Sequence, residues 1–125
     1  MGKRTFAVLG ILLGAVVTAT TVQADSYTDA FAAAESGNYD QALNLFTPLA
    51  EQGNAQAQFN LALMYHGGLG VKRSEQQALV WYQRAAANGS KEAQEFLAVG
   101  YQEGWFGLPR DNQQASYWFE RLKDS

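Results

Sequence analysis

An internal repeat with a period of 36 residues limits what this chain can fold into. When the segment 55–90 is shifted by that period, residues of the same kind coincide: Ala57, Gln58, Leu61, Ala62, Tyr65 and Gly68 fall on Ala93, Gln94, Leu97, Ala98, Tyr101 and Gly104. One residue is inserted near Trp105, and beyond it Ala78 and Trp81 match Ala115 and Trp118. Such self-similarity is typical of repeat arrays, in which each unit buries its apolar face against its neighbours.

The first 24 residues have the pattern of a secretory signal peptide. Lys3 and Arg4 precede an apolar run from Phe6 to Val17, and small residues lead to a cut after Ala24. The run is short for a membrane span, although an uncleaved N-terminal anchor is the alternative. We therefore expect a domain of residues 25–125 in the periplasm or outside the cell, not stably inserted in a membrane.

The composition of residues 25–125 excludes several classes of protein. Without Lys3 and Arg4, seven basic residues oppose twelve acidic ones, which gives a net charge of −5. Nucleic acids and anionic membranes require clustered positive charge, so neither is an expected partner. The chain contains no cysteine, so an exported domain of this size must be stable through packing alone.

The apolar spacing predicts an all-α fold of six helices. They form three antiparallel pairs, at residues 25–54, 55–90 and 91–125. No segment alternates with a period of two over a useful length, so no sheet is expected. Each helix after the first is preceded by a residue suited to cap its N-terminus, namely Asn38, Asn54, Ser74, Ser90 and Asp111.

The spacing of Ala, Gly, Tyr and Trp resembles the Sel-one-like repeat, a relative of the tetratricopeptide repeat. Ala57–Gly89 matches one full unit, Lys91–Lys123 a second, and Asn38–Asn54 a half-repeat that includes the phrase PLAEQG. The resemblance implies an α/α solenoid with a right-handed superhelical twist and a concave face. It also implies a bacterial protein that holds other proteins.

Two other functions remain open at this stage. Some secreted relatives with cysteine-rich repeats have been associated with penicillin binding and β-lactam hydrolysis, so the resemblance leaves open an envelope enzyme or cell-wall ligand binder. This chain lacks those cysteines, which weakens that alternative. The other alternative is a structural subunit of a larger envelope assembly.

Residues that could carry catalysis are few. His66 is the only histidine, so a histidine-rich metal site or a local catalytic dyad lacks a second member. Glu92 and Glu95 share a helical face, where acid–base chemistry or cation binding is possible, but a solvated edge favoured by the helix dipole is the simpler interpretation. We expect no enzyme activity, cofactor or metal.

The remaining candidate is a surface for a protein or peptide. In the related repeats, the first helix of each pair lines the groove. Carried over by position, this face holds Tyr27, Phe31, Gln56, Phe59, Leu63, His66, Glu92, Glu95, Val99 and Gln102. It is an apolar trough with two carboxylates at one end, suited to an amphipathic helix or an extended peptide with a basic residue near Glu92. Alternatively, Phe59, Leu63 and Val99 pack between adjacent first helices.

Two further features suggest binding. Trp105 and Phe106 add aromatic bulk at the inserted residue, and we expect one ring to turn inward and the other outward. The last helix has no following helix, so Tyr117 or Leu122 is expected to be partly exposed. That exposure would allow weak self-association.

Overall fold

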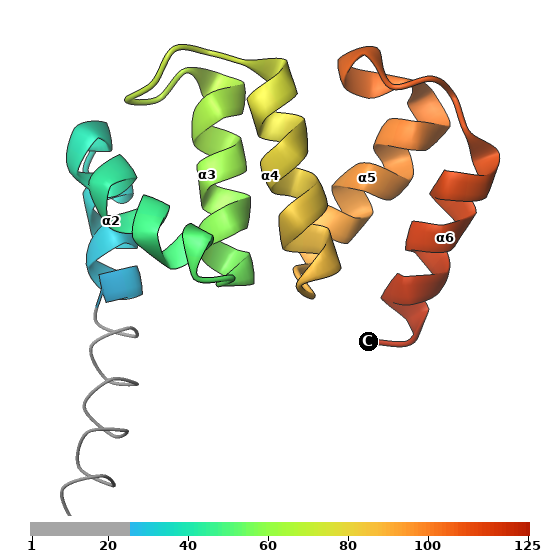
Figure 1. Ribbon diagram of the computed structural model, residues 1–125, viewed down its shortest axis with the longest axis horizontal. Coiled ribbons are helices and arrows are strands. Elements are labelled where there is room, and N and C mark those ends of the chain that lie inside the picture. The colour runs from blue at the N-terminus through green and yellow to red at the C-terminus, as the bar shows by residue number, and fades with distance from the viewer. Residues whose placement is uncertain (1–25) are drawn as a thin grey trace, which may run out of the picture.

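The computed structural model describes residues 26–125, which form helices joined by turns and loops (Figure 1). Residues 26–35 form the first helical segment described, followed by the elements α2 (Tyr39–Glu51), α3 (Ala55–Gly67), α4 (Glu75–Ala87), α5 (Lys91–Glu103), η1 (Trp105–Gly107) and α6 (Asn112–Lys123). No strand occurs among these residues, which confirms the all-α prediction. The predicted signal peptide lies outside the described residues.

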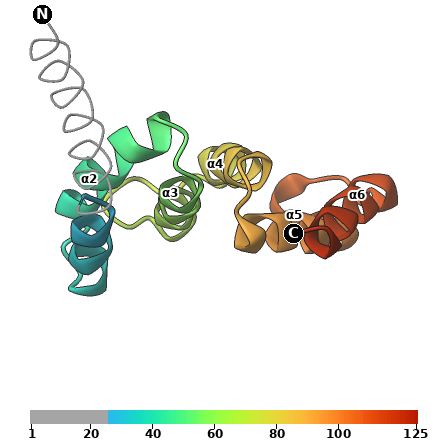
Figure 2. The same cartoon turned by 90° about the horizontal axis from the view of Figure 1, so that it is seen from below.

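The helices follow one another across the molecule in sequence order, from the N-terminal pair to α6 (Figures 1 and 2). The two long connections, residues 68–74 and 104–111, lie along one side of the row, and the tight turns after α2 and α4 lie along the opposite side (Figure 1). Consecutive helices are therefore antiparallel, as the alternation of long and short connections in a helix-pair solenoid requires.

Side chains at the predicted caps satisfy the exposed backbone donors that begin each helix. The Asn54 side chain accepts a hydrogen bond from the Ala57 N–H at 2.9 Å, and Ser90 Oγ accepts one from the Ala93 N–H at 3.2 Å. Asn38 and Ser74 cap α2 and α4 in the same way, and Asp111 caps α6 through two backbone donors. The predicted helix starts are confirmed.

Small residues at the repeat positions allow the helices to approach closely. Ala62, Ala78, Ala86 and Ala98 are fully buried, and the space between them is filled by larger side chains. The largest fully buried side chains are Tyr82, Phe46, Leu61 and Leu97. Close packing of this kind stabilises the described domain, which contains no cysteine.

A glutamine bridges each tight turn. Gln58 Nε2 donates to the Ala50 carbonyl at 2.9 Å, and Gln94 Nε2 donates to the Ala86 carbonyl at 3.0 Å. Both glutamines are buried, so each bond satisfies a carbonyl near the C-terminus of the preceding helix. The glutamine that recurs in the sequence repeat thus makes the same hydrogen bond in both units.

Candidate functional site

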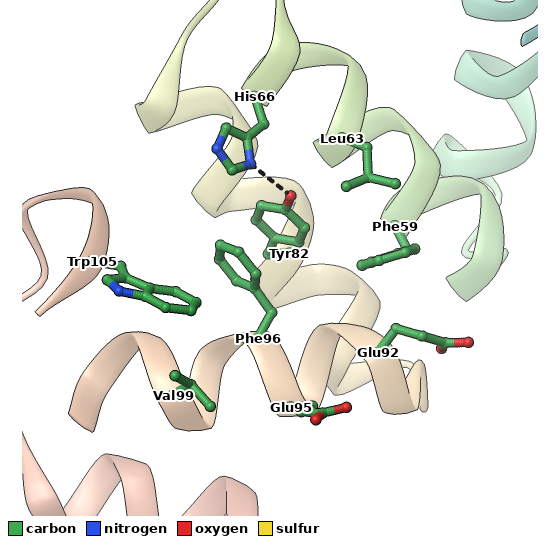
Figure 3. A pocket seen from close by; sticks show the side chains of 9 residues that line it. All are labelled: Phe59, Leu63, His66, Tyr82, Glu92, Glu95, Phe96, Val99 and Trp105. Carbon is green, nitrogen blue, oxygen red and sulfur yellow. Dashed lines mark hydrogen bonds between the residues drawn. The ribbon is translucent and has the colours of Figure 1, made fainter. Parts of the chain in front are cut away.

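A pocket of about 360 Å³ opens between α3 and α5, with α4 behind it (Figure 3). We call it the aromatic pocket. It is lined by Phe59, Leu63, His66, Tyr82, Glu92, Glu95, Phe96, Val99 and Trp105. Because α3 and α5 are the first helices of successive pairs, the pocket lies on the face for which the sequence predicted binding.

Helical spacing places the lining residues on two facing walls. Phe59, Leu63 and His66 lie at successive turns of α3. Glu92, Glu95, Phe96 and Val99 occupy one stripe of α5, at positions i, i+3, i+4 and i+7. Phe59 and Val99 are half-buried, and Leu63 remains 41% exposed. These side chains therefore border the pocket, with Phe59 also packed on Tyr82 at a centroid distance of 5.9 Å.

Stacked rings form the base of the pocket. The rings of Tyr82 and Phe96 lie 4.0 Å apart between centroids and are nearly parallel, at 18°. Trp105 extends the group, with its ring 5.4 Å from that of Phe96. Ring pairs in these arrangements contribute about 0.5–1.5 kcal/mol beyond their burial, so they hold the pocket in one shape.

A polar contact fixes the buried end of Tyr82. Its hydroxyl lies 3.1 Å from His66 Nδ1, and the Tyr82 side chain is fully buried (Figure 3). Burial raises the pKa of the Tyr82 phenol to about 12, because the charged phenolate would lose its hydration. The phenol is therefore neutral at ordinary pH and available for a hydrogen bond to the imidazole.

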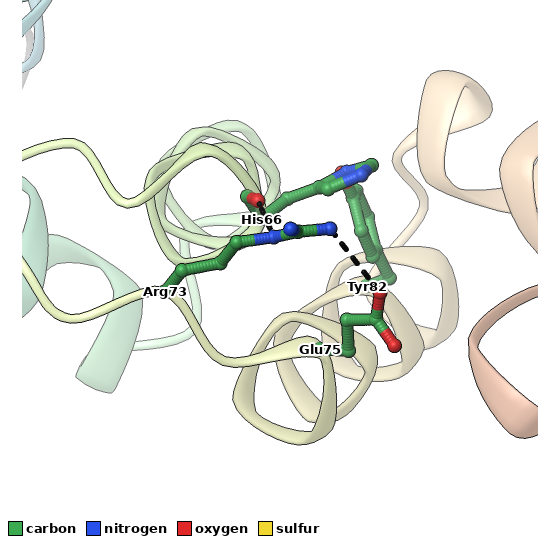
Figure 4. Close-up of polar contacts among 4 residues, drawn as sticks. All are labelled: His66, Arg73, Glu75 and Tyr82. Atoms are coloured by element: carbon green, nitrogen blue, oxygen red, sulfur yellow. Dashed lines mark hydrogen bonds and ion pairs between the residues drawn. The ribbon is translucent and has the colours of Figure 1, made fainter.

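The C-terminal turn of α3, which carries His66, is held by the connection that follows it. Arg73 Nε donates to the His66 carbonyl at 3.2 Å, and the same guanidinium pairs with Glu75 at 3.2 Å (Figure 4). The Arg73 and Glu75 side chains are both largely exposed, so their ion pair contributes little stability by itself. The contact positions the loop beside the pocket.

The second long connection contains the inserted residue and forms the short helix η1. This helix closes one side of the pocket. Trp105 is 42% exposed, whereas Phe106 is half-buried with its ring 4.7 Å from that of His66. One ring is thus outward and the other inward. Phe106 has a left-handed backbone, with φ 55°, which is uncommon for a residue other than glycine.

The other predicted binding residues lie outside the aromatic pocket. Phe31 lines a neighbouring cavity of about 290 Å³ between residues 26–35, α2 and α3, which Leu63 of the aromatic pocket also borders. Tyr27 packs edge-on against Phe46, with a centroid distance of 5.9 Å, and serves the core. Gln56 and Gln102 are exposed and do not line the pocket. The predicted residues therefore divide among the aromatic pocket, two cavities beside it, the core and solvent, with Phe106 lining the second of these cavities.

Two pocket residues were missed by sequence reasoning. The sequence predicted that Tyr82 lies on the buried face of its helix, and its side chain is indeed fully buried. It was not predicted to line the pocket as well. Phe96 was not considered. It completes the stripe of Glu92, Glu95 and Val99 on α5, and that helical spacing is the signal that would have identified it.

The described residues show no arrangement that indicates a metal site. Within residues 26–125 no three His, Asp or Glu side chains gather closely enough to hold a metal ion. Over the same range, none of the helices has the length and apolar character needed to cross a membrane. Glu92 and Glu95 are exposed at the pocket edge. Together with the rings of Phe96 and Trp105, these two carboxylates can contact a ligand in the pocket.

Comparison with known families agrees with this architecture. A sequence model of the Sel1 repeat matches residues 33–54, 55–90 and 91–124. The chain belongs to the Sel1 repeat family. Sel1 repeats form non-catalytic helical scaffolds that generally mediate protein–protein interactions. The resemblance inferred from the repeated Ala, Gly, Tyr and Trp spacing is confirmed.

Solved Sel1 structures share the fold. A Sel1 repeat protein from Oxalobacter formigenes is 30% identical, with a TM-score of 0.60 over 68% of this chain and 64% of that one. The protective antigen c5321 of uropathogenic Escherichia coli is 28% identical, with a TM-score of 0.72 over 84% of this chain and 23% of that one. The α/α solenoid is thereby confirmed.

A curated relative is also similar in sequence. DAP3-binding cell death enhancer 1 of Rattus norvegicus is 40% identical over 57 residues, which is 46% of this chain and 11% of that protein. This Sel1 chain therefore spans about a tenth of that relative, and less than two thirds of the two solved structures.

Proposed function

We propose that this Sel1 protein is an exported, non-catalytic adaptor that binds a protein or peptide on its concave face. The aromatic pocket is the observation that carries the proposal. Tyr82 and Phe96 stack at its base, and Trp105 and Leu63 beside them are 42% and 41% exposed. Exposed, preorganised aromatic side chains supply binding energy at low entropic cost, which is why they are frequent at the centres of interfaces.

The neighbouring cavity supports a partner larger than a single small molecule. Leu63 lines both cavities, so they adjoin along α3. An extended segment advances about 3.3 Å per residue, so a short peptide is long enough to place side chains in both. A helix lying along this face would do the same with side chains one turn apart.

Substitution in the pocket tests the binding surface. We expect Phe59→Glu and Trp105→Ala to reduce partner recovery roughly tenfold, because each removes an apolar side chain that lines the pocket. Matched controls are Val80→Glu and Tyr117→Ala, which change exposed side chains outside the pocket (Val80 40% exposed, Tyr117 49%). The readout is crosslinking in cells, followed by quantitative mass spectrometry of the crosslinked proteins.

The outcome is decisive only if the variants fold. Circular dichroism should show the helical spectrum of the wild type for all four proteins. If the same partners are recovered in the same amounts with Phe59→Glu and Trp105→Ala as with the controls, the pocket is not the binding surface and the proposal fails.

Export is tested at the N-terminus. We expect residues 1–24 to direct the chain across the membrane and to be removed, so that the protein recovered from the producing cell begins at Asp25. Intact-mass measurement distinguishes this from the full chain. Replacement of Lys3 and Arg4 by glutamate should slow export, because the positive start of a signal peptide is lost. Recovery of the uncut chain in the cytoplasm would contradict the export part of the proposal.

A further inference from the structure

The cavities on this face carry only one sign of charge. Two cavities adjoin the aromatic pocket. One lies beside it and is lined by His66, Glu75, Phe96, Trp105 and Phe106; the other is the cavity that shares Leu63. Across the three, the charged lining residues are Glu35, Glu75, Glu92 and Glu95, and no lysine or arginine is among them.

Residues 26–125 place a cation beside only one of these carboxylates. Glu75 pairs with Arg73 at 3.2 Å, but the other ion pair of residues 26–125 joins Lys123 to Glu120, far along the chain on α6. Glu92 accepts only a hydrogen bond from the Ser90 hydroxyl, at 3.3 Å. Glu35, Glu92 and Glu95 therefore lie at the rims of apolar cavities without a cation from the described chain.

Rings and carboxylates lie together at the aromatic pocket. Glu92 and Glu95 project from the same helix stripe as Phe96, and Figure 3 shows Glu92 on the side toward Phe59, with Glu95 farther along α5. A guanidinium group is planar and always charged; it stacks on aromatic faces and donates paired hydrogen bonds to carboxylates. A phosphate or carboxylate ligand would instead be repelled by this edge.

From these observations we propose that the occupant of the aromatic pocket is an arginine-bearing segment of the partner protein, with its guanidinium at Glu92 and Glu95 and a flanking apolar side chain against Phe96 and Trp105. This inference rests on the proposed function and specifies the chemistry of the partner. A lone small cation would satisfy the carboxylates but would leave the adjoining cavity at Leu63 unfilled, whereas a peptide segment fills both.

Selection from a random peptide library provides the test. The protein, purified after expression of the full chain, is used to select twelve-residue peptides displayed on phage. We expect the selected peptides to contain arginine beside a large apolar residue. The best peptide is then synthesised in two forms, one with arginine and one with citrulline, which has nearly the same shape but no charge. The citrulline form should bind roughly tenfold more weakly.

Variants of the protein locate the contact. Glu92→Gln and Glu95→Gln should each weaken the arginine peptide several-fold, and the double variant should bind the two peptide forms equally. Glu103→Gln is the matched control, because Glu103 is an exposed glutamate on the same helix that lines none of the three cavities. The affinity of the wild type for the arginine peptide should fall with added salt, and that of the double variant much less.

The failure of this inference differs from the failure of the proposed function. The arginine assignment is overturned if the selected peptides are not enriched in arginine and bind Glu92→Gln and Glu95→Gln as tightly as the wild type. The binding surface still stands in that case, provided that the peptides no longer bind Trp105→Ala. If no selected peptide depends on Phe59 or Trp105, both are overturned.

Discussion

Tyr82 links the core to the binding face. Its ring is fully buried and stacks on Phe96 in the pocket, and its hydroxyl lies 3.1 Å from His66 Nδ1. A tyrosine buried with a single polar partner is stable only as the neutral phenol. The same burial that shapes the pocket therefore makes the stability of the protein sensitive to high pH.

We expect the free energy of unfolding to fall as the pH rises from 10 to 12. Burial raises the pKa of Tyr82 from 10.0 to about 12, so over this range the folded protein keeps a proton that the unfolded chain has lost. The neutral Tyr82 phenol contributes on the order of 2 kcal/mol to the free energy of unfolding. This contribution is fully present below pH 10 and is lost as the pH rises through the pKa of Tyr82 in the folded protein.

The measurement is urea unfolding at a series of pH values for the wild type and Tyr82→Phe. The variant lacks the ionisable group, so its stability should decline less across this range. Equal slopes in the two proteins would show that Tyr82 does not cause the alkaline loss.

At the scale of elements, the two turns bridged by glutamine are not equivalent. Gln58 makes a second bond, because its Oε1 accepts from Asn88 Nδ2 at 2.9 Å and so joins α3 to the end of α4. Gln94 Oε1 is buried, and among the described residues it has no hydrogen-bond partner. With the 37-residue offset, Ser125 takes the place of Asn88, and its hydroxyl bonds the Leu122 carbonyl instead.

This difference predicts unequal effects of the same substitution. Gln58→Ala should lower the free energy of unfolding more than Gln94→Ala, by roughly 1 kcal/mol, because only Gln58→Ala leaves Asn88 without its partner. The two residues are equally buried and bond equivalent carbonyls, so each is the control for the other. Chemical denaturation measures both, and equal losses would contradict the role of Asn88.

Across the whole molecule, stability is distributed along a row of units. Among residues 26–125 each helix contacts mainly its neighbours in sequence, so the unit 55–90 packs against a described unit on each side and the unit 91–124 against one. Leu61 and Leu97 occupy equivalent positions in these two units, with exposed fractions of 1% and 0%. Their substitution therefore tests how far a local change spreads.

Leu61→Ala and Leu97→Ala should each cost about 2–5 kcal/mol, the range for a leucine removed from a packed core. Hydrogen exchange should separate them. We expect Leu97→Ala to reduce protection chiefly in α5 and α6, and Leu61→Ala to reduce it in all helices. If protection falls equally everywhere in both variants, the domain unfolds as one cooperative unit rather than as coupled repeats.

The sequence alone determined the architecture of this Sel1 protein. Periodic alanines and aromatic residues specified three helix pairs, and Asn54, Ser90 and Asp111 marked helix starts that the structure contains. These signals are local or recur at a fixed period, so they can be read without knowledge of contacts. The same spacing placed Phe59, Leu63, Glu92 and Glu95 on first helices, and the structure brings them to one pocket.

Only the tertiary structure decided the composition of that pocket. Tyr82 belongs to a second helix, and its ring reaches the aromatic pocket because α4 lies behind α3 and α5. Phe106 turns onto His66 through a left-handed backbone conformation that no propensity of phenylalanine predicts. Helix periodicity specifies which side of one helix is apolar, but the distance between side chains on different helices depends on how those helices pack.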